Sequence, residues 1–136
     1  MDLPMFVSGA VRRATALCFV LALALSSVWA DGVNKKVRFA KGKSATVIKG
    51  AVVRGDRDRY TVGASSGQKM TVSISSLEKN AVFQIYRPGE SDTLEGAGEG
   101  EDATRWSGEL PDDGNYIIVV GGTRGNATYS LKIAIK

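Results

Sequence analysis

The chain has 136 residues, of which 43% are apolar and 24% are charged, with 18 basic and 14 acidic side chains. These numbers fit one small domain, and such a mixture of charges lacks the clustered basic surface that nucleic-acid binding needs. Because the sequence has no histidine and its single cysteine, Cys18, lies in an apolar N-terminal run, a Ser-His-Asp triad and a zinc site built from imidazole or thiolate are excluded.

The first 30 residues have the three parts of a secretory signal peptide. Two arginines precede an apolar run over 14–25, and small residues follow it up to Ala30. The apolar run is shorter than the roughly 20 residues that a spanning helix needs, which favours cleavage after Ala30 over a retained N-terminal anchor. The pattern predicts a signal peptide over 1–30 and an exported domain, periplasmic or secreted, over 31–136.

The exported domain shows the pattern of an all-β fold. Its apolar residues recur with a period of two, and turn residues interrupt them roughly every eight to twelve positions. The stretch 116–120 is apolar on both faces, which is typical of a central strand covered on both sides. The predicted strands are 35–40, 45–53, 58–64, 69–76, 81–87, 104–109, 115–121 and 127–135. With no helical period after residue 30, this predicts two antiparallel sheets packed as a β-sandwich of jelly-roll type.

The segment 90–102 is acidic and rich in glycine. It holds six carboxylates, interspersed with three glycines. Oxygen ligands on a loop can coordinate calcium, but the spacing does not match an EF-hand loop, so we interpret the segment as a mobile, solvated loop. No metal and no cofactor is predicted. Paired carboxylates of the glycosidase kind remain open on residue type alone, although most acids fall in predicted loops.

The tyrosines and Trp106 divide between the core and the surface. Tyr60, Tyr116 and Tyr129 fall on the inward phases of their strands and are predicted to fill the core. Tyr86 and Trp106 are predicted to lie at the surface.

Several stretches resemble the bacterial pre-peptidase C-terminal type of β-sandwich, and together they span nearly the whole exported domain. They are Asp56-Arg-Asp-Arg-Tyr60, Gly67-Gln68 at the start of an alternating strand, Leu110-Pro-Asp-Asp-Gly-Asn-Tyr116, and the closing Tyr129-Ser-Leu131. This resemblance implies the fold and a binding role, since such domains are appended to many secreted proteins.

A closer resemblance is to the family of periplasmic inhibitors of goose-type (g-type) lysozyme. The similar stretches are 37–44, 67–75, Gly114-Asn-Tyr116, Thr123-Arg124 and Ile133-Ala-Ile-Lys136. The resemblance implies that loops at one end of the sandwich insert into the substrate cleft of the lysozyme, with arginines facing its acidic catalytic region. Arg124 is the position that corresponds best. The chain departs from the family pattern in two ways: the loop 121–128 is short and lacks a second arginine, and Gly55 or Arg57 replaces an expected tyrosine.

Four residues are the predicted partner-binding set: Arg124 and Thr123 in one loop, and Arg54 and Arg57 around an earlier turn. A guanidinium offers a fixed fork of donors to a carboxylate, and a partly desolvated pair of this kind can anchor an interface. The alternative is that Arg124 is a solvated loop charge and that the acids interleaved with the earlier arginines neutralise that surface locally.

These observations predict a binding protein rather than an enzyme. The preferred hypothesis is an exported inhibitor whose partner is a g-type lysozyme, with no nucleic acid bound and no stable membrane insertion after signal cleavage. The alternative is a non-inhibitory module of the pre-peptidase type that holds cell-wall glycan or another exported protein. The oligomeric state is left open.

Overall fold

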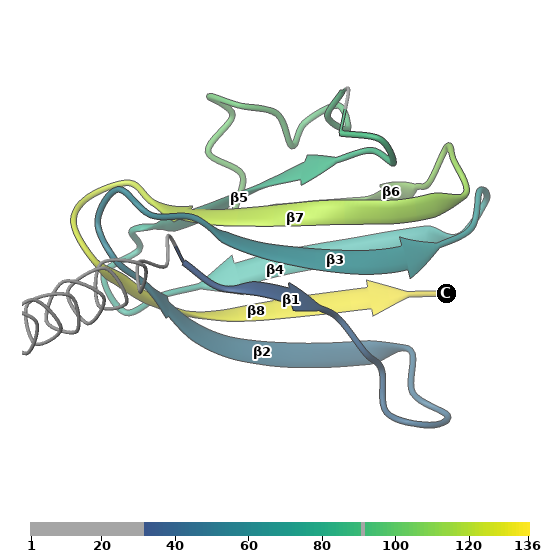
Figure 1. Ribbon diagram of the computed structural model, residues 1–136, viewed down its shortest axis with the longest axis horizontal. Coiled ribbons are helices and arrows are strands. Elements are labelled where there is room, and N and C mark those ends of the chain that lie inside the picture. The colour runs from purple at the N-terminus through teal and green to yellow at the C-terminus, as the bar shows by residue number, and fades with distance from the viewer. Residues whose placement is uncertain (1–31, 91) are drawn as a thin grey trace, which may run out of the picture. The chain divides into compact units, whose positions relative to one another are not determined.

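The computed structural model describes residues 32–90 and 92–136, so the predicted signal peptide lies outside the described residues. Two four-stranded sheets pack face to face, as Figure 1 shows. Sheet A has the order β1-β3-β7-β5, and sheet B has the order β2-β8-β4-β6. The strands are β1 (Asn34–Lys36), β2 (Ala45–Val52), β3 (Asp58–Ala64), β4 (Lys69–Ser75), β5 (Ala81–Tyr86), β6 (Arg105–Glu109), β7 (Gly114–Gly122) and β8 (Ala127–Ile135). The predicted β-sandwich is confirmed.

The first strand is the main departure from the predicted elements. It is much shorter than the predicted 35–40, and it pairs with β3 in parallel, whereas all other strand pairs in the described chain are antiparallel. β1 lies at the edge of sheet A, and after Lys36 only the amide of Val37 continues the ladder, donating to the carbonyl of Thr61 at 2.7 Å. The chain then leaves the sheet toward β2.

Successive strands always change sheet, and the tight connections therefore gather at the two ends of the sandwich. The turns β2–β3 (residues 53–57), β4–β5 (76–80) and β7–β8 (123–126) lie at one end, which we call the loop end; it is on the left in Figure 1. The connections β1–β2, β3–β4 and β6–β7 lie at the other end, together with the chain's C-terminus. The alternation agrees with the predicted jelly-roll type.

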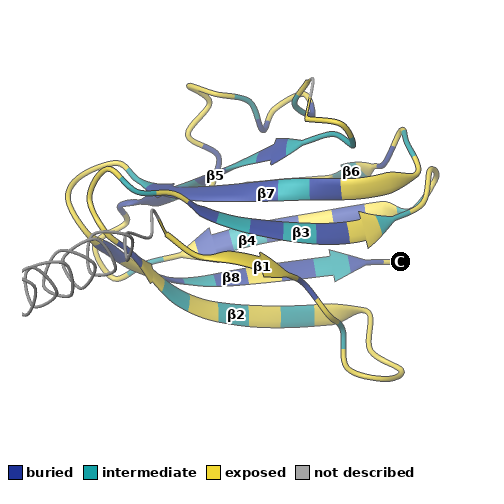
Figure 2. Cartoon of the chain, viewed as in Figure 1, coloured by how far each residue is buried: buried dark blue, intermediate teal, exposed yellow. Residues whose placement is uncertain are grey.

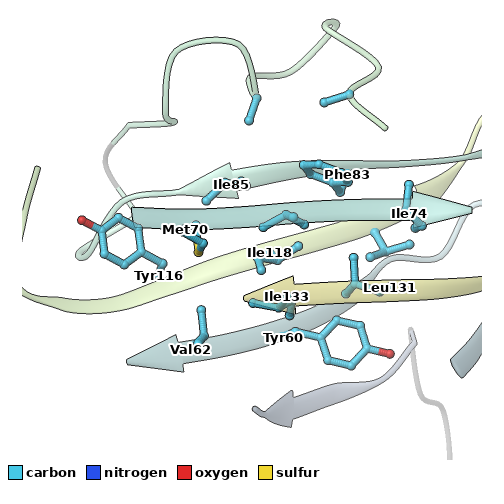
Figure 3. Packing of buried hydrophobic residues seen from close by; sticks show 14 of the residues in the cluster. Tyr60, Val62, Met70, Ile74, Phe83, Ile85, Tyr116, Ile118, Leu131 and Ile133 are labelled. Atoms are coloured by element: carbon cyan, nitrogen blue, oxygen red, sulfur yellow. The ribbon is translucent and has the colours of Figure 1, made fainter. Parts of the chain in front are cut away.

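The core lies between the sheets and is built by the predicted alternation. Along β8 the side chains of Tyr129, Leu131, Ile133 and Ile135 are buried, and the residues between them are not. Figure 2 shows similar banding on the strands, and Figure 3 shows core side chains of both sheets meeting. Each large apolar side chain buried in this way contributes about 1.5–3 kcal/mol. The three tyrosines that were predicted to fill the core are all buried.

Trp106 corrects the surface prediction. It is partly buried and packs against the core, and its indole N–H donates to the carbonyl of Glu95 at 2.9 Å. The ring lies close to Gly108, where an added Cβ would come within 3.0 Å of it. The polar end of the indole is satisfied by the acidic segment, which allows the ring to lie inward.

The acidic segment is also more ordered than predicted. Its described residues run along the free edge of β5: the amide of Leu94 donates to the carbonyl of Ile85, whose own amide donates to Ala97. Leu94 and Ala97 are buried. A segment that covers an edge in this way satisfies the exposed hydrogen-bonding groups of that strand. Across 32–90 and 92–136, no group of three or more His, Cys, Asp or Glu side chains is placed to hold a metal ion.

None of the described residues belongs to a helix long and apolar enough to cross a membrane.

Candidate partner-binding end

The loop end consists of three tight turns, two of which contain a glycine with a positive φ. In the β2–β3 turn, Gly55 has a φ of 87° and the amide of Asp56 donates to the carbonyl of Val53 at 2.9 Å. In the β7–β8 turn, Gly125 has a φ of 62°. Both positions lie in the left-handed region that glycine adopts without a steric penalty.

Asn80 joins the β4–β5 turn to the β7–β8 turn. This side chain is only 2% exposed, and its Nδ2 donates to the carbonyl oxygens of Arg124 and Asn126, both at 2.9 Å. In return, the amide of Thr123 donates to the backbone carbonyl of Asn80 at 2.9 Å. A buried amide with both donors engaged fixes the hairpin in one position relative to the neighbouring turn.

The third turn is connected to the same hairpin. The backbone amide of Arg54 donates to Oδ1 of Asn126 at 2.8 Å. The β2–β3, β4–β5 and β7–β8 turns are therefore linked by hydrogen bonds into one unit.

The four predicted binding residues all lie at the loop end and are all exposed. The Nη2 of Arg124 donates to the carbonyl of Glu78 at 2.9 Å, which leaves the other N–H groups of the guanidinium free for a partner. The Arg57 side chain lies against Gly121, because a Cβ added there would come within 2.5 Å of Nη1 of Arg57. For Arg54 the structure gives only the backbone contact described above.

Arg57 and Thr123 share a shallow groove of about 270 Å³ on the outer side of sheet A. Glu99 and Asp102 line the same groove, and both are exposed. This pair of carboxylates thus lacks the buried acid that glycoside hydrolysis requires.

The sequence reasoning missed exposed apolar side chains at this end. Leu77 is 95% exposed and Val53 is 58% exposed, and both line a groove of about 570 Å³ together with Asn80 and Asn126. Large apolar side chains exposed beside arginines are typical of protein interfaces. A signal was present in the sequence, because Leu77 is the single apolar residue in the polar run 75–80.

A buried polar network lies directly beneath the β2–β3 turn. The carboxyl group of Asp58 accepts from the amide of Val33 at 2.8 Å and from the hydroxyl of Tyr129 at 2.6 Å. The Tyr129 and Tyr60 hydroxyls are in turn 2.6 Å apart. Burial, reinforced by the hydrogen bond to Asp58, raises the pKa of Tyr129 far above its ordinary value, and burial also raises the pKa of Tyr60. Both tyrosines therefore stay neutral and serve as structural support.

Comparisons with known proteins agree with this picture. No family model matches the sequence. The inhibitor of g-type lysozyme from Escherichia coli (strain K12) is 36% identical over 112 residues, which cover 82% of this chain and 75% of the relative. The pre-peptidase C-terminal domain of a collagenase from Bacillus anthracis shares the fold at 18% identity, with a TM-score of 0.55 over 79% of this chain and 99% of that domain.

Two solved structures of periplasmic inhibitors of g-type lysozyme are more similar. PliG from Aeromonas hydrophila is 32% identical, with a TM-score of 0.66 over 79% of this chain and all of that one. PliG from Salmonella Typhimurium is 30% identical, with a TM-score of 0.63 over 77% of this chain and 99% of that one.

The fold places the chain in the class of two-sheet β-sandwich domains, a fold that it shares with the pre-peptidase C-terminal domain. Within that class, the chain belongs to the family of g-type lysozyme inhibitors. The relatives of known structure are periplasmic, in agreement with the compartment predicted from the sequence. The alternative of a non-inhibitory module is not favoured, since the relatives at 30% identity or more are inhibitors of g-type lysozyme.

Proposed function

We propose that this chain inhibits a g-type lysozyme in the periplasm by inserting the loop end into the substrate cleft of that enzyme. The observation that carries the proposal is the arrangement of Arg124, whose exposed guanidinium lies on a hairpin locked by Asn80. A preorganised loop loses less conformational entropy on binding than a free one, so more of the contact energy appears as affinity.

The guanidinium groups suit the chemistry of the target. Glycoside hydrolases use a pair of carboxyl groups that flank the scissile bond, and an arginine can pair with such a carboxylate through two parallel hydrogen bonds. Arg124 would face this pair from the hairpin. Arg57, lying against Gly121 next to the same hairpin, would provide the second guanidinium that the loop 121–128 does not contain.

Leu77 would supply the apolar part of the interface. Its exposed side chain lies in the turn that accepts the hydrogen bond from Arg124 through Glu78. Burying a leucine side chain of this kind contributes about 1.5–3 kcal/mol. Arginine is one of the residues enriched in binding hot spots, and apolar contacts around such a residue exclude water from it.

The inhibitor would act by occupying the cleft and not by chemistry of its own. The exported domain has no histidine or cysteine, and Glu99 and Asp102, the acids of the groove that Arg57 and Thr123 share, are exposed. These features leave steric and electrostatic blocking as the mechanism that the residues support.

A titration of g-type lysozyme with the purified protein, followed by lysis of a cell-wall substrate, tests the proposal. We expect inhibition by the wild-type protein and an inhibition constant about tenfold weaker for Leu77→Ser, because the apolar anchor is lost. Val47→Ser is the matched control, since Val47 is 56% exposed and lies on sheet B away from the loop end. If Leu77→Ser and Val47→Ser weakened inhibition equally, the assignment of the loop end as the lysozyme-binding surface would be refuted.

A further inference from the structure

The outer face of sheet B is a second, chemically distinct surface. Alternate residues of its four strands point away from the core. Four of these side chains are basic, Lys136 adds a fifth directly after β8, and a single one, Glu109, is acidic. The basic residues are Lys49, Lys69, Arg105, Lys132 and Lys136, and the hydroxyl residues between them are Thr71, Ser73, Ser75, Ser107, Thr128 and Ser130.

The positive charge of this basic face is only partly offset by the protein, through Glu109, which lies opposite Lys69 in the strand register. The ion pairs within the described residues join Arg59 to Glu90, and Arg87 to Asp92 and Asp112, so none involves the basic face. Lys69 and Lys136 lie directly opposite one another and exchange two backbone hydrogen bonds of 2.9 and 3.0 Å. Like charges placed opposite in a sheet repel, and an anion bound between them would relieve that repulsion.

The same face is hollowed into a trough of about 470 Å³. The small side chains of Thr71, Ser73 and Ala134 line it between two pairs of long cations. Lys69 and Lys136 form one pair, and Arg105 and Lys132 flank Ser73 from the two neighbouring strands. Lys132 and Lys136 are four residues apart in the sequence, which corresponds to about 13 Å at the usual rise of a strand.

We propose that the basic face binds a linear acidic polysaccharide along this trough. The cations match its carboxylates, and the hydroxyls, which both donate and accept, match its sugar hydroxyls. An acidic peptide could accept from these hydroxyl residues, but its ionised side chains donate nothing in return, whereas each sugar hydroxyl both donates and accepts.

A lipid surface fits the basic face less well than a polysaccharide. Membrane-surface binding relies on aromatic or leucine side chains that enter the bilayer. Among the described residues, the exposed large apolar side chain on this face is Val47 alone. The trough also begins at Lys69 and Lys136, which lie at the end of the sandwich opposite the loop end. Polysaccharide binding would thus leave the loop end accessible.

Binding of the protein, purified from the periplasm, to polygalacturonate at low salt tests this inference. We expect saturable binding that weakens with added salt, and about a tenfold loss in the double variant Lys132→Ser, Arg105→Ser. The matched control is Lys41→Ser, Lys43→Ser, which removes two exposed lysines from the β1–β2 connection and should bind like the wild type. Thermal unfolding of both variants establishes that they fold.

The same binding measurement with two other anionic probes distinguishes a polysaccharide from an acidic peptide and from a lipid surface. Polyglutamate and phosphatidylglycerol vesicles, compared at equal charge concentration, should bind more weakly than polygalacturonate. Equal or stronger binding of either probe, no binding of polygalacturonate, or equal losses in the two double variants would overturn the inference. Because Lys132 and Arg105 lie on the outer face of sheet B and in none of the three turns of the loop end, lysozyme inhibition should be unchanged in the Lys132→Ser, Arg105→Ser variant, so the two proposals can fail separately.

Discussion

Asn80 is the side chain that connects the stability of the core to the geometry of the loop end. Its two amide protons hold two carbonyl oxygens of the β7–β8 turn. The polar residues Glu78-Lys-Asn80 after the predicted strand 69–76 indicated a turn, but nothing in the local sequence indicates that the last residue of this turn is buried. Long-range hydrogen bonds, over 44 and 46 residues here, depend on which strands the fold brings together.

Replacing this residue should affect both stability and inhibition. Asn80→Ala leaves the Arg124 and Asn126 carbonyls without their buried donor, and we expect the free energy of unfolding to fall by about 1–3 kcal/mol. Inhibition should weaken because the hairpin carrying Arg124 is less ordered. Urea unfolding and the lysozyme titration measure the two effects. Asn115→Ala, at an exposed position on β7, should change neither, and equal effects would contradict the role of Asn80.

The hydroxyl of Tyr129 is a second residue whose role can be measured. Tyr129→Phe removes the donor to Asp58, and at neutral pH we expect a loss of about 2 kcal/mol in the free energy of unfolding. Tyr86→Phe is the control, because the hydroxyl of Tyr86 makes only a 3.4 Å contact with Gln84.

The same tyrosine predicts how stability depends on pH. Since the folded-state pKa of Tyr129 lies above the ordinary 10.0, the unfolded chain loses this proton first as the pH rises. The free energy of unfolding should therefore fall as the pH rises above about 10. The fall should be shallower in Tyr129→Phe, and an identical slope in both proteins would contradict the network. Urea unfolding between neutral and strongly alkaline pH provides the measurement.

At the scale of elements, the apolar patterning and the turn residues between the runs placed every boundary of the strands from β2 to β8 within one residue. Alternation reports burial on one face, and these strands all bury one face in the core. It could not locate β1, whose three residues are all exposed. The acidic segment was missed for a related reason: its described residues contact the edge of β5 mainly through the backbone, which leaves no periodic pattern.

The candidate site was predictable in part. The resemblance to the inhibitor family pointed to Thr123 and Arg124, and the arginines around an earlier turn suggested Arg54 and Arg57. The structure places all four in the turns of the loop end. Leu77 was missed because a single apolar residue in a turn has no period. The contact between the Arg57 side chain and Gly121 was missed because it depends on the pairing of β3 with β7.

A glycine within β2 gives a test at the element scale. At Gly50, an added Cβ would lie 2.6 Å from the hydroxyl oxygen of Tyr129. Gly50→Ala should displace that ring and lower the free energy of unfolding by about 1–3 kcal/mol. The same change at Gly63 in β3, where the nearest atom is Oδ1 of Asn115 at 3.3 Å, should have a smaller effect in thermal or urea unfolding. Equal effects would show that the packing of Tyr129 does not require a glycine.

At the scale of the whole molecule, the sandwich holds two different surfaces at fixed positions. The loop end combines arginines with exposed apolar side chains, and the outer face of sheet B combines cations with hydroxyls. Because hydrogen bonds link the three turns to one another and to the packed strands, we expect the loop end to bind its partner as a nearly rigid body.

The central claim is that the loop end blocks a g-type lysozyme through Arg124. The most direct measurement is the inhibition constant against g-type lysozyme for the wild-type protein, Arg124→Ala, and Arg38→Ala as the control on the exposed β1–β2 connection. We predict inhibition by the wild type, at least a tenfold loss for Arg124→Ala, and no change for Arg38→Ala, with equal thermal stability in all three. No inhibition by the wild type at micromolar excess, or unchanged potency of Arg124→Ala, would contradict the claim.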